Sequence, residues 1–474
     1  KHEYIAGSAT WHGINRYKKC CKRCNKSRSN FKIDIEDYII EKNIKIEDLD
    51  NFNWYIEGSG RLHPNENNEF RKYSQEEIIK DGQIELFISD KQINLNNKKS
   101  KLIVHGQGTI LFKNNNKPIV FKIVNNNNDG LVIYMDNNVS TVKRISNNEK
   151  YGLSNKGLIN NNDAYYWFSL DSQNQILRIG VGEARPETEI YKYEFPKNDQ
   201  KVYEKNKSFL ESLTLIKDII NINIIKLLRD PIVNSVPLTV KKTDDLTMED
   251  IASNKFLPHS NLSPTAQKLY ECISGKKFIL DNSDFPDFSK AIEYSIATPG
   301  LWCNKKLKDK STEFNPSKPN INETYLRITL GANSGESPGI PYVMEIWPSN
   351  HYSPVHSHAT TDAIIRVLHG EINVNLYPFL SSKPVKSFAS QTFYKNEITW
   401  ISPELNQIHQ LINKNQNETC ITIQCYMYGK NNRVHYDYFD YVNEDGKIEL
   451  YEPDSDMDYI SFKKLMRQEW NNRK

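Results

Sequence analysis

The sequence has few cysteines and no long apolar run, and these two absences exclude several classes of protein. Its 474 residues contain seven cysteines, an odd and sparse set that does not suit a disulfide scaffold, so a reducing, cytoplasmic compartment is the default expectation. No stretch of about 18 consecutive apolar residues occurs, so no membrane span is expected. The formal net charge is only +3, and nothing in that balance indicates that the whole protein binds nucleic acid.

The charge that the chain does carry is concentrated at its start. Residues 1–30 hold eight Lys or Arg and one Glu, and they include the sequence "KKCCKRCNKSR". We interpret residues 16–28 as a solvated basic arm that could contact an anionic partner. The alternative is a structural zinc site, because a C-x-x-C pair needs two further ligands. The candidate ligands would be Cys20, Cys21, Cys24, His2 and His12.

The pattern along the chain predicts a mainly β protein with more than one domain, since 474 residues exceed the size of an ordinary domain. Short β-branched and aromatic runs such as "PIVFKIV" and "GLVIYMD", separated by Asn, Asp and Gly, predict an antiparallel β-sandwich in the N-terminal half. The expected divisions are a basic lead segment (1–50), a β-sandwich domain (51–200), a helix and linker (201–258), a second β domain that begins with helices (259–445) and a C-terminal tail (446–474).

One stretch in the expected sandwich carries a resemblance of its own. The sequence "YYWFSLDSQNQILRIGVGEARPE" is similar to the β-sandwich domain named after farnesoic acid O-methyltransferase. That resemblance implies a packing or binding module, which would take another protein or a small ligand.

Helical spacing follows the sandwich. Residues 208–229 place apolar side chains at 209, 213, 216, 220, 224 and 227, which predicts a helix that ends at Asp230-Pro231. An extended linker is expected after it. Residues 263–298 again have a helical pattern, and strands are expected from 324 onward.

Four of the eleven histidines fall within "NHYSPVHSHATTDAIIRVLHG" (350–370). His356 and His358 are two residues apart, so on a strand both imidazoles point to the same face. Imidazole suits iron, copper, zinc and nickel, and two ligands on a rigid strand suit one cation. For a lone H-x-H, the favoured interpretation is two solvent-facing polar residues on a strand. His409 and Asn413 follow downstream in "WISPELNQIHQLINKN".

This order of histidines resembles the two motifs of the cupins, which are small jelly-roll barrels with a metal inside the barrel mouth. The resemblance implies a C-terminal cupin barrel, preceded by helices, over residues 259–445. Counting back from Gly370, the carboxylate ligand of the first cupin motif would fall at Ala363, and the neighbouring Asp362 would face the other way. We therefore expect three neutral imidazoles, no carboxylate ligand and three open positions on an octahedral ion.

A cupin with three histidines resembles the cysteine dioxygenase family, and the similarity extends over residues ~260–440. The segments that carry it are "SIATPGLW", "YLRITL" and "HQLINKNQNETCITIQCY". An arginine fork suits a carboxylate, which lysine cannot bind in the same bidentate way. The residues that the resemblance implies are His356, His358 and His409 as ligands of Fe(II), Arg327 and Tyr325 as catalytic and carboxylate-binding residues, Tyr426 as the catalytic phenol, and Thr422 and Gln424 beside the substrate.

The sequence departs from the family at two positions. Ala363 stands where the animal enzymes have a cysteine, so the thioether crosslink to the active-site tyrosine cannot form. The family's Ser-x-His-x-Tyr relay is Thr422-x-Gln424-x-Tyr426 here. Glutamine cannot relay a proton as histidine does, but its amide can orient the tyrosine hydroxyl. The departures put the substrate and the rate in question.

The resemblance implies an Fe(II)-dependent dioxygenase that uses O₂ to oxidise a small carboxylate-bearing thiol, such as cysteine, to its sulfinic acid. A second hypothesis is a catalytically reduced cupin scaffold in a structural or interaction protein. The abundance of Asn, Ile, Lys and Tyr is typical of AT-rich genomes, such as those of giant DNA viruses, so this scaffold could be virion-associated. A third is a cupin that uses another metal on a substrate other than a thiol.

The remaining histidines and cysteines of this region are given structural roles. His351 has an odd offset from His356 and is expected to point away from the metal, and His369 lies beside the turn glycine. His435 belongs to an aromatic segment that could cap the barrel. Cys420 and Cys425 are expected to pack in the core.

Overall fold

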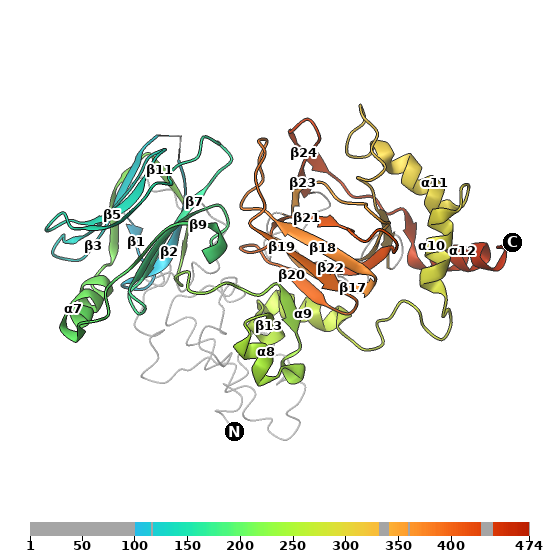
Figure 1. Ribbon diagram of the computed structural model, residues 1–474, viewed down its shortest axis with the longest axis horizontal. Helices are drawn as coiled ribbons and strands as arrows, with labels where there is room; N and C mark the ends of the chain where they lie inside the picture. The colour runs from blue at the N-terminus through green and yellow to red at the C-terminus, as the bar shows by residue number, and fades with distance from the viewer. Residues whose placement is uncertain (1–99, 115–116, 331–340, 359–360, 428–438, 474) are drawn as a thin grey trace, which may run out of the picture. The chain divides into compact units, whose positions relative to one another are not determined.

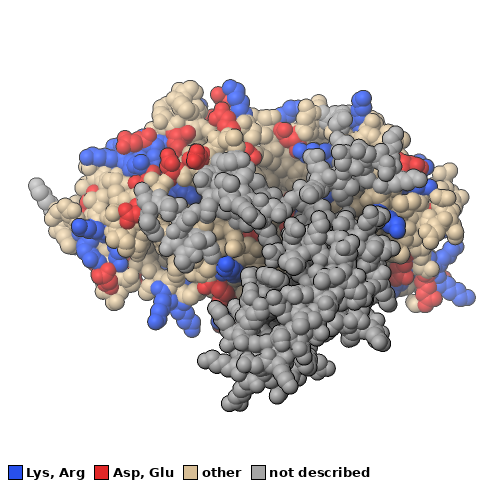
Figure 2. Space-filling view, turned by 180° about the vertical axis from the view of Figure 1, so that it is seen from behind, with Lys and Arg blue, Asp and Glu red and all other residues tan. Residues whose placement is uncertain are grey.

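The computed structural model describes residues 100–473 except 115–116, 331–340, 359–360 and 428–438. The basic arm, its zinc alternative, residues 51–99 of the expected sandwich domain and His435 lie outside these residues. None of the helices in the described chain has the length and apolar character needed to cross a membrane. On the face shown in Figure 2, basic and acidic side chains of the described residues intermingle, as the small net charge suggests.

The described chain is mainly β and divides into two compact units, which are labelled by element in Figure 1. The second unit includes two short segments that interrupt the sequence of the first, and it starts at Asn234 instead of the expected 259. Among the described residues, the first unit comprises 100–160, 166–179 and 190–233, and the second comprises 161–165, 180–189 and 234–473.

The first unit is the β-sandwich that the sequence predicts, with antiparallel pairing along its strands. Aromatic rings fill the space between its sheets: the ring centroid of Phe121 lies 5.7 Å from that of Phe112 and 5.8 Å from that of Phe168. One sheet has the order β1 (Ser100–Lys101), β10 (Leu215–Ile220), β3 (Ile119–Val124), β4 (Gly130–Met135), β5 (Ser140–Arg144) and β6 (Lys150–Ser154). The other has the order β11 (Ile222–Leu228), β2 (Gln107–Asn114), β7 (Tyr166–Asp171), β8 (Ile176–Val181) and β9 (Glu189–Glu194).

The prediction of a helix over residues 208–229 is wrong. Helix α7 (Gln200–Glu211) ends early in that stretch, and β10 and β11 take up the remainder. The segment is rich in isoleucine, which packs well on a pleated sheet and loses side-chain freedom in a helix. Each strand also pairs with a sandwich sheet, β10 with β3 and β11 with β2, so tertiary pairing prevails over the helical spacing.

The second unit contains the expected barrel, in which two sheets enclose a core. From β15 to β23, successive strands alternate between the sheets apart from the β18–β19 hairpin, which is a jelly-roll arrangement. One sheet has the order β13 (Phe256–Pro258), β12 (Thr239–Lys241), β20 (Ile398–Ile401), β17 (Asp362–His369), β22 (Cys420–Met427), β15 (Tyr342–Trp347), β14 (Leu326–Thr329) and β25 (Met457–Asp458). The other has the order β19 (Ala389–Tyr394), β18 (Glu371–Leu376), β21 (Ile408–Ile412), β16 (His356–Ser357), β23 (Phe439–Val442) and β24 (Ile448–Tyr451).

Side chains of the eight-stranded sheet alternate between an outer and an inner face. Outward residues such as Met344, Ile364 and Ile423 share one apolar cluster with helical residues, including Phe462 near the C-terminus. The expected C-terminal tail therefore contributes to the barrel's outer core. The helices of this unit are α8 (Met248–Ala252), α9 (Pro264–Ile273), α10 (Phe288–Ala297), α11 (Trp302–Asp309) and α12 (Tyr459–Asn471), with 3₁₀ turns η3 (Pro186–Thr188), η4 (Thr243–Asp245), η5 (His259–Asn261) and η6 (Lys310–Thr312).

Candidate metal centre

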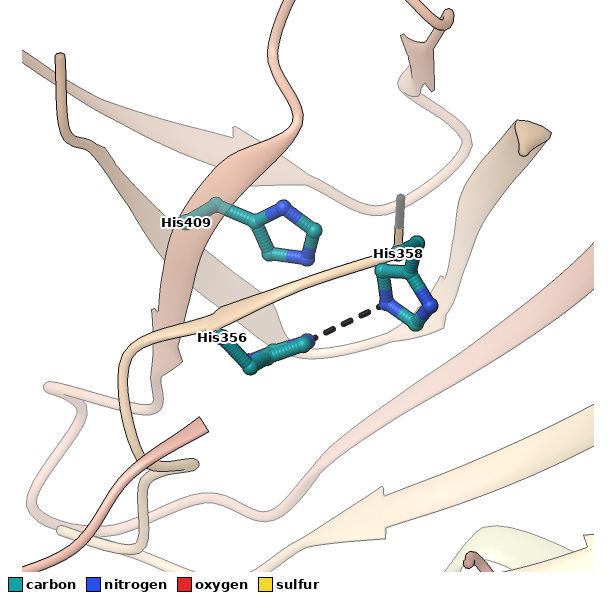
Figure 3. Close-up of side chains that lie close together, drawn as sticks. All are labelled: His356, His358 and His409. Atoms are coloured by element: carbon teal, nitrogen blue, oxygen red, sulfur yellow. Dashed lines mark hydrogen bonds between the residues drawn. The ribbon is translucent and has the colours of Figure 1, made fainter. Parts of the chain in front are cut away.

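Three histidines converge on the inner face of the barrel, as Figure 3 shows. His356 on β16 is the direct cross-strand partner of His409 on β21, and His358 follows two residues after His356. One ligand nitrogen from each ring lies within 4.8 Å of the other two. The structure thus brings together the three residues that the sequence predicts as ligands.

The protonation of these rings suits metal binding. Burial lowers the pKa of His356 and of His358 well below the usual range, and it lowers the pKa of His409 to about 4. Each ring is therefore neutral near pH 7, which is the ligating form of imidazole. Nδ1 of His356 lies 2.9 Å from the Pro354 carbonyl and Nδ1 of His409 lies 3.1 Å from the Asn406 carbonyl, so both can direct Nε2 toward a cation.

No carboxylate joins the three imidazoles among the residues that the structure describes. Ala363, which stands in the carboxylate position of the cupin motif, is buried and is the cross-strand partner of Tyr426. Asp362 faces away and accepts a 2.9 Å hydrogen bond from Ser263 at the start of α9. Both placements agree with the alternation expected from the sequence.

A polar row crosses three strands of the opposite wall. Arg327 on β14 is paired with Glu345 on β15, and Glu345 is paired with Thr422 on β22. Nη1 of Arg327 lies 3.4 Å from Oε1 of Glu345, a longer separation than the 2.7–2.9 Å typical of a charge-assisted hydrogen bond. The Arg327 charge is close enough to the triad to contribute to the lowered pKa of His356 and His358.

Glu345 is a buried carboxylate that our reading of the sequence missed. Burial raises its pKa to about 7, against the lowering effects of the Arg327 and Lys310 charges and of the Gln424 amide. Its position two residues before Trp347 in "YVMEIW" places it on the inward face. That offset was the available signal, but the partner of the carboxylate follows only from the strand register.

Gln424 links Glu345 to Tyr426. Its Nε2 donates to Glu345 Oε2, and the Tyr426 hydroxyl donates to its Oε1. Because a carboxyl oxygen of Glu345 accepts the Gln424 amide N–H, Glu345 fixes which end of the Gln424 amide faces the phenol. The ring of Tyr426 lies beside that of His358, with 5.5 Å between centroids, so the chain of hydrogen bonds ends next to the triad.

Tyr325 and Thr422 complete this wall. The ring of Tyr325 is buried and stacked on Trp347 at 4.3 Å between centroids, two residues from Arg327 on the same strand face. Trp347 Nε1 donates to Thr422 Oγ1 over 3.3 Å, and Gln424 Nε2 lies 3.4 Å from that same oxygen. The predicted substrate and catalytic residues therefore share one inward-facing wall.

The other histidines and cysteines have structural surroundings. His351 is buried with Nδ1 2.9 Å from the Thr324 carbonyl, and His369 forms an ion pair with Glu418 at 3.2 Å when protonated. Cys420 and Cys425 are both buried, and Cys425 belongs to the outer cluster while its neighbour Tyr426 faces inward.

No protein-family model matches the chain. Similar solved structures include the cupin domain of Schizosaccharomyces pombe Cnp3 (12% identity, 22% of this chain and 65% of that one, TM-score 0.18). A complex of oxalate oxidase with a substrate analogue, glycolate, is also similar (17% identity, 24% of this chain and 53% of that one, TM-score 0.18). So is a sugar phosphate isomerase of Silicibacter pomeroyi (10% identity, 28% of this chain and 80% of that one, TM-score 0.19). The chain thus spans about half of the oxalate oxidase chain. Likenesses this low carry no functional conclusion.

The strand order of the second unit and the geometry of its histidines nevertheless define the type of fold and of site. The second unit is a cupin-type jelly-roll barrel with a buried histidine triad whose neutral rings can hold a metal ion.

Proposed function

We propose that the barrel is a mononuclear Fe(II)-dependent dioxygenase that oxidises a small thiol with O₂ to a sulfinic acid. The observation that supports it most is the arrangement of three neutral imidazoles beside Tyr426 and Arg327, without a carboxylate ligand. Three imidazoles leave open positions on an octahedral ion. The bound iron would supply coordination of the thiolate and activation of O₂.

The chain's own residues would bind and orient the substrate. Arg327 supplies a cationic group on the wall facing the triad and would hold a carboxylate, which fixes the substrate without altering its reactivity. Tyr325, two residues earlier, would bind the same carboxylate through its hydroxyl. The hydroxyl of Tyr426 donates to Gln424, and the ring lies beside that of His358, so the phenol would border the bound substrate.

The second candidate is a barrel that has lost turnover and serves as a scaffold. The contact between Arg327 and Glu345 favours it, because a carboxylate of the protein already occupies one side of the guanidinium. A substrate carboxylate would need to share that fork. The scaffold would retain its fold and, at most, its metal.

Iron content after reconstitution separates the two candidates. The enzyme is expected to bind about one iron per chain, and His356→Ala is expected to lose it because the remaining two imidazoles hold a cation weakly. His369→Ala is the matched control, since His369 lies outside the triad and is partly exposed. A folded parent protein that takes up no iron would favour the scaffold.

Mass spectrometry of cysteine and of 3-mercaptopropionate, each incubated with iron-loaded protein and O₂, tests the reaction itself. The proposal expects a product two oxygen atoms heavier than the thiol, formed more slowly by Arg327→Ala. Iron-loaded protein that leaves both thiols unchanged would argue against these substrates.

A further inference from the structure

The turn that precedes β21 is held by a segment of the chain about 220 positions earlier. Asn406 lies in this turn, and its backbone N–H donates to Oε2 of Glu183 over 2.9 Å. Nη1 of Arg185 donates to Oδ1 of Asn406 and to Oε1 of Glu183, both over 2.9 Å. Residues 180–189 belong to the same compact unit as the barrel, although they run from the end of β8 to the start of β9 in the sandwich.

Asn406 needs such anchors because of its backbone conformation. Its φ of 65° lies in the left-handed region, which asparagine tolerates better than most residues but which still has to be maintained by its surroundings. Its Nδ2 donates to the Trp400 carbonyl over 3.1 Å. The side-chain oxygen, the side-chain nitrogen and the backbone N–H are therefore all engaged.

The remaining polar group of Asn406 contacts the candidate metal centre. Its carbonyl oxygen lies 3.1 Å from Nδ1 of His409, where it can accept the ring proton and leave Nε2 as the ligand atom. The position of this carbonyl thus sets both the tautomer and the direction of the His409 ring.

The chemistry of Glu183 and Arg185 indicates a directional role. Both side chains are only 2% exposed, and a buried ion pair contributes little net stability because desolvating the charges costs about as much as their attraction returns. Apolar residues could fill the same space. The charged pair instead provides hydrogen bonds of fixed direction to Asn406. Arg185 is itself held by Glu187 and by the Val236 carbonyl.

We propose that Glu183 and Arg185 are positioning residues for the metal ligand His409, acting through Asn406. The inference rests on the metal binding in the proposed function, and it ties metal affinity to a segment far from the barrel strands in sequence. We call Glu183, Arg185 and their hydrogen bonds to Asn406 the clamp. Disturbing the clamp weakens metal binding more than it lowers the stability of the fold.

Cobalt(II) binding to the full-length, metal-free protein tests this. The visible absorption of bound Co²⁺ reports ligand number and geometry, and a chelator competition gives the dissociation constant. Arg185→Lys is expected to raise that constant roughly 10-fold or more, the range for partners that orient a ligand. Glu183→Gln retains an oxygen acceptor for the Asn406 N–H and is expected to bind Co²⁺ nearly as tightly as the parent.

Arg366→Lys is the matched control. Arg366 is also buried and also donates to an asparagine of positive φ, over 3.0 Å to Oδ1 of Asn396, but that turn carries no ligand. The control is expected to lose thermal stability while keeping its Co²⁺ affinity. Equal Co²⁺ affinity in Arg185→Lys and Arg366→Lys would overturn the inference.

A second variant covers the case in which Arg185→Lys does not fold. Asn406→Gly keeps the backbone conformation and the carbonyl but removes both side-chain anchors, so weaker Co²⁺ binding with an altered spectrum is expected. Unchanged binding would contradict the role of the clamp. A folded parent that binds no Co²⁺ would instead overturn the proposed metal function together with this inference.

Discussion

Glu345 is a buried carboxyl on the wall opposite the triad, and its environment makes the stability of the fold depend on pH. Burial raises its folded pKa to about 7, above the 4.5 of an ordinary glutamate. The folded state therefore holds this proton more tightly than the unfolded state. The stabilisation is complete below about pH 4.5 and is lost as the pH rises through about 7.

Glu345→Gln should remove this dependence. Between pH 4.5 and 8 the free energy of unfolding of the parent, relative to the variant, is expected to fall on the order of 3 kcal/mol. Urea titrations of both proteins at several pH values measure it. The comparison cancels the effects of other buried carboxyls such as Glu323, whose pKa is also raised to about 7 by burial. Parallel pH profiles would show that Glu345 does not titrate in this way.

Tyr426→Phe separates metal binding from turnover, again at the scale of one residue. The variant loses the hydroxyl that donates to Gln424 but retains the ring beside His358. Iron affinity is expected to stay unchanged, while thiol-dependent oxygen uptake falls by roughly 10²-fold, the size of a lost proton-transfer or positioning group. Tyr441→Phe is the control, because its hydroxyl contacts Phe314 and Glu449 instead. An equal loss of oxygen uptake in both variants would show that the Tyr426 hydroxyl has no specific role in turnover.

At the scale of the element, the N-cap residue of α9 is hydrogen-bonded to β17, the strand that follows the H-x-H motif. The Ser263 hydroxyl accepts from the Ala266 N–H over 3.1 Å and donates to Asp362 of β17 over 2.9 Å. Ser263→Ala removes both bonds and is expected to cost about 1 kcal/mol of unfolding free energy. Ser263→Thr retains the hydroxyl and should restore most of it. Chemical denaturation measures both, and an unaffected Ala variant would contradict the capping role.

Elements with a strong local pattern could be predicted, whereas their pairing could not. The β-branched runs of the sandwich and the H-x-H strand of the barrel are visible in the sequence because alternation of side chains is a local property. The stretch 208–229 was misassigned because apolar spacing fits a helix as well as two isoleucine-rich strands, and only pairing with β2 and β3 decides between them.

The same distinction applies to the site. Strand spacing put His356 and His358 on one face, and the resemblance to the cupin motifs added His409 as the third ligand. The pairing of Arg327 with Glu345 depends on the register of β14 against β15, which no single strand specifies. The hydrogen bonds to Asn406 depend on contacts across more than 200 residues, which a single sequence cannot reveal.

At the scale of the whole molecule, the two units have separate cores, so a core mutation should destabilise one of them selectively. Phe462 of α12 is completely buried and packs against Trp302, with 5.4 Å between ring centroids. Phe462→Ala is expected to cost about 3–5 kcal/mol in the barrel unit. Phe168→Ala, which removes a buried ring of the sandwich, is the matched variant.

Hydrogen exchange followed by mass spectrometry resolves the two units in the intact chain. Peptides from β22 should exchange faster in Phe462→Ala while peptides from β7 keep the protection of the parent, and Phe168→Ala should give the converse. The sandwich variant also tests the interleaved sequence, because residues 180–189 belong to the barrel unit but connect β8 to β9. If loosening the sandwich also released this segment, peptides around Asn406 would lose protection in Phe168→Ala. Faster exchange throughout both units in either variant would show that they unfold as one.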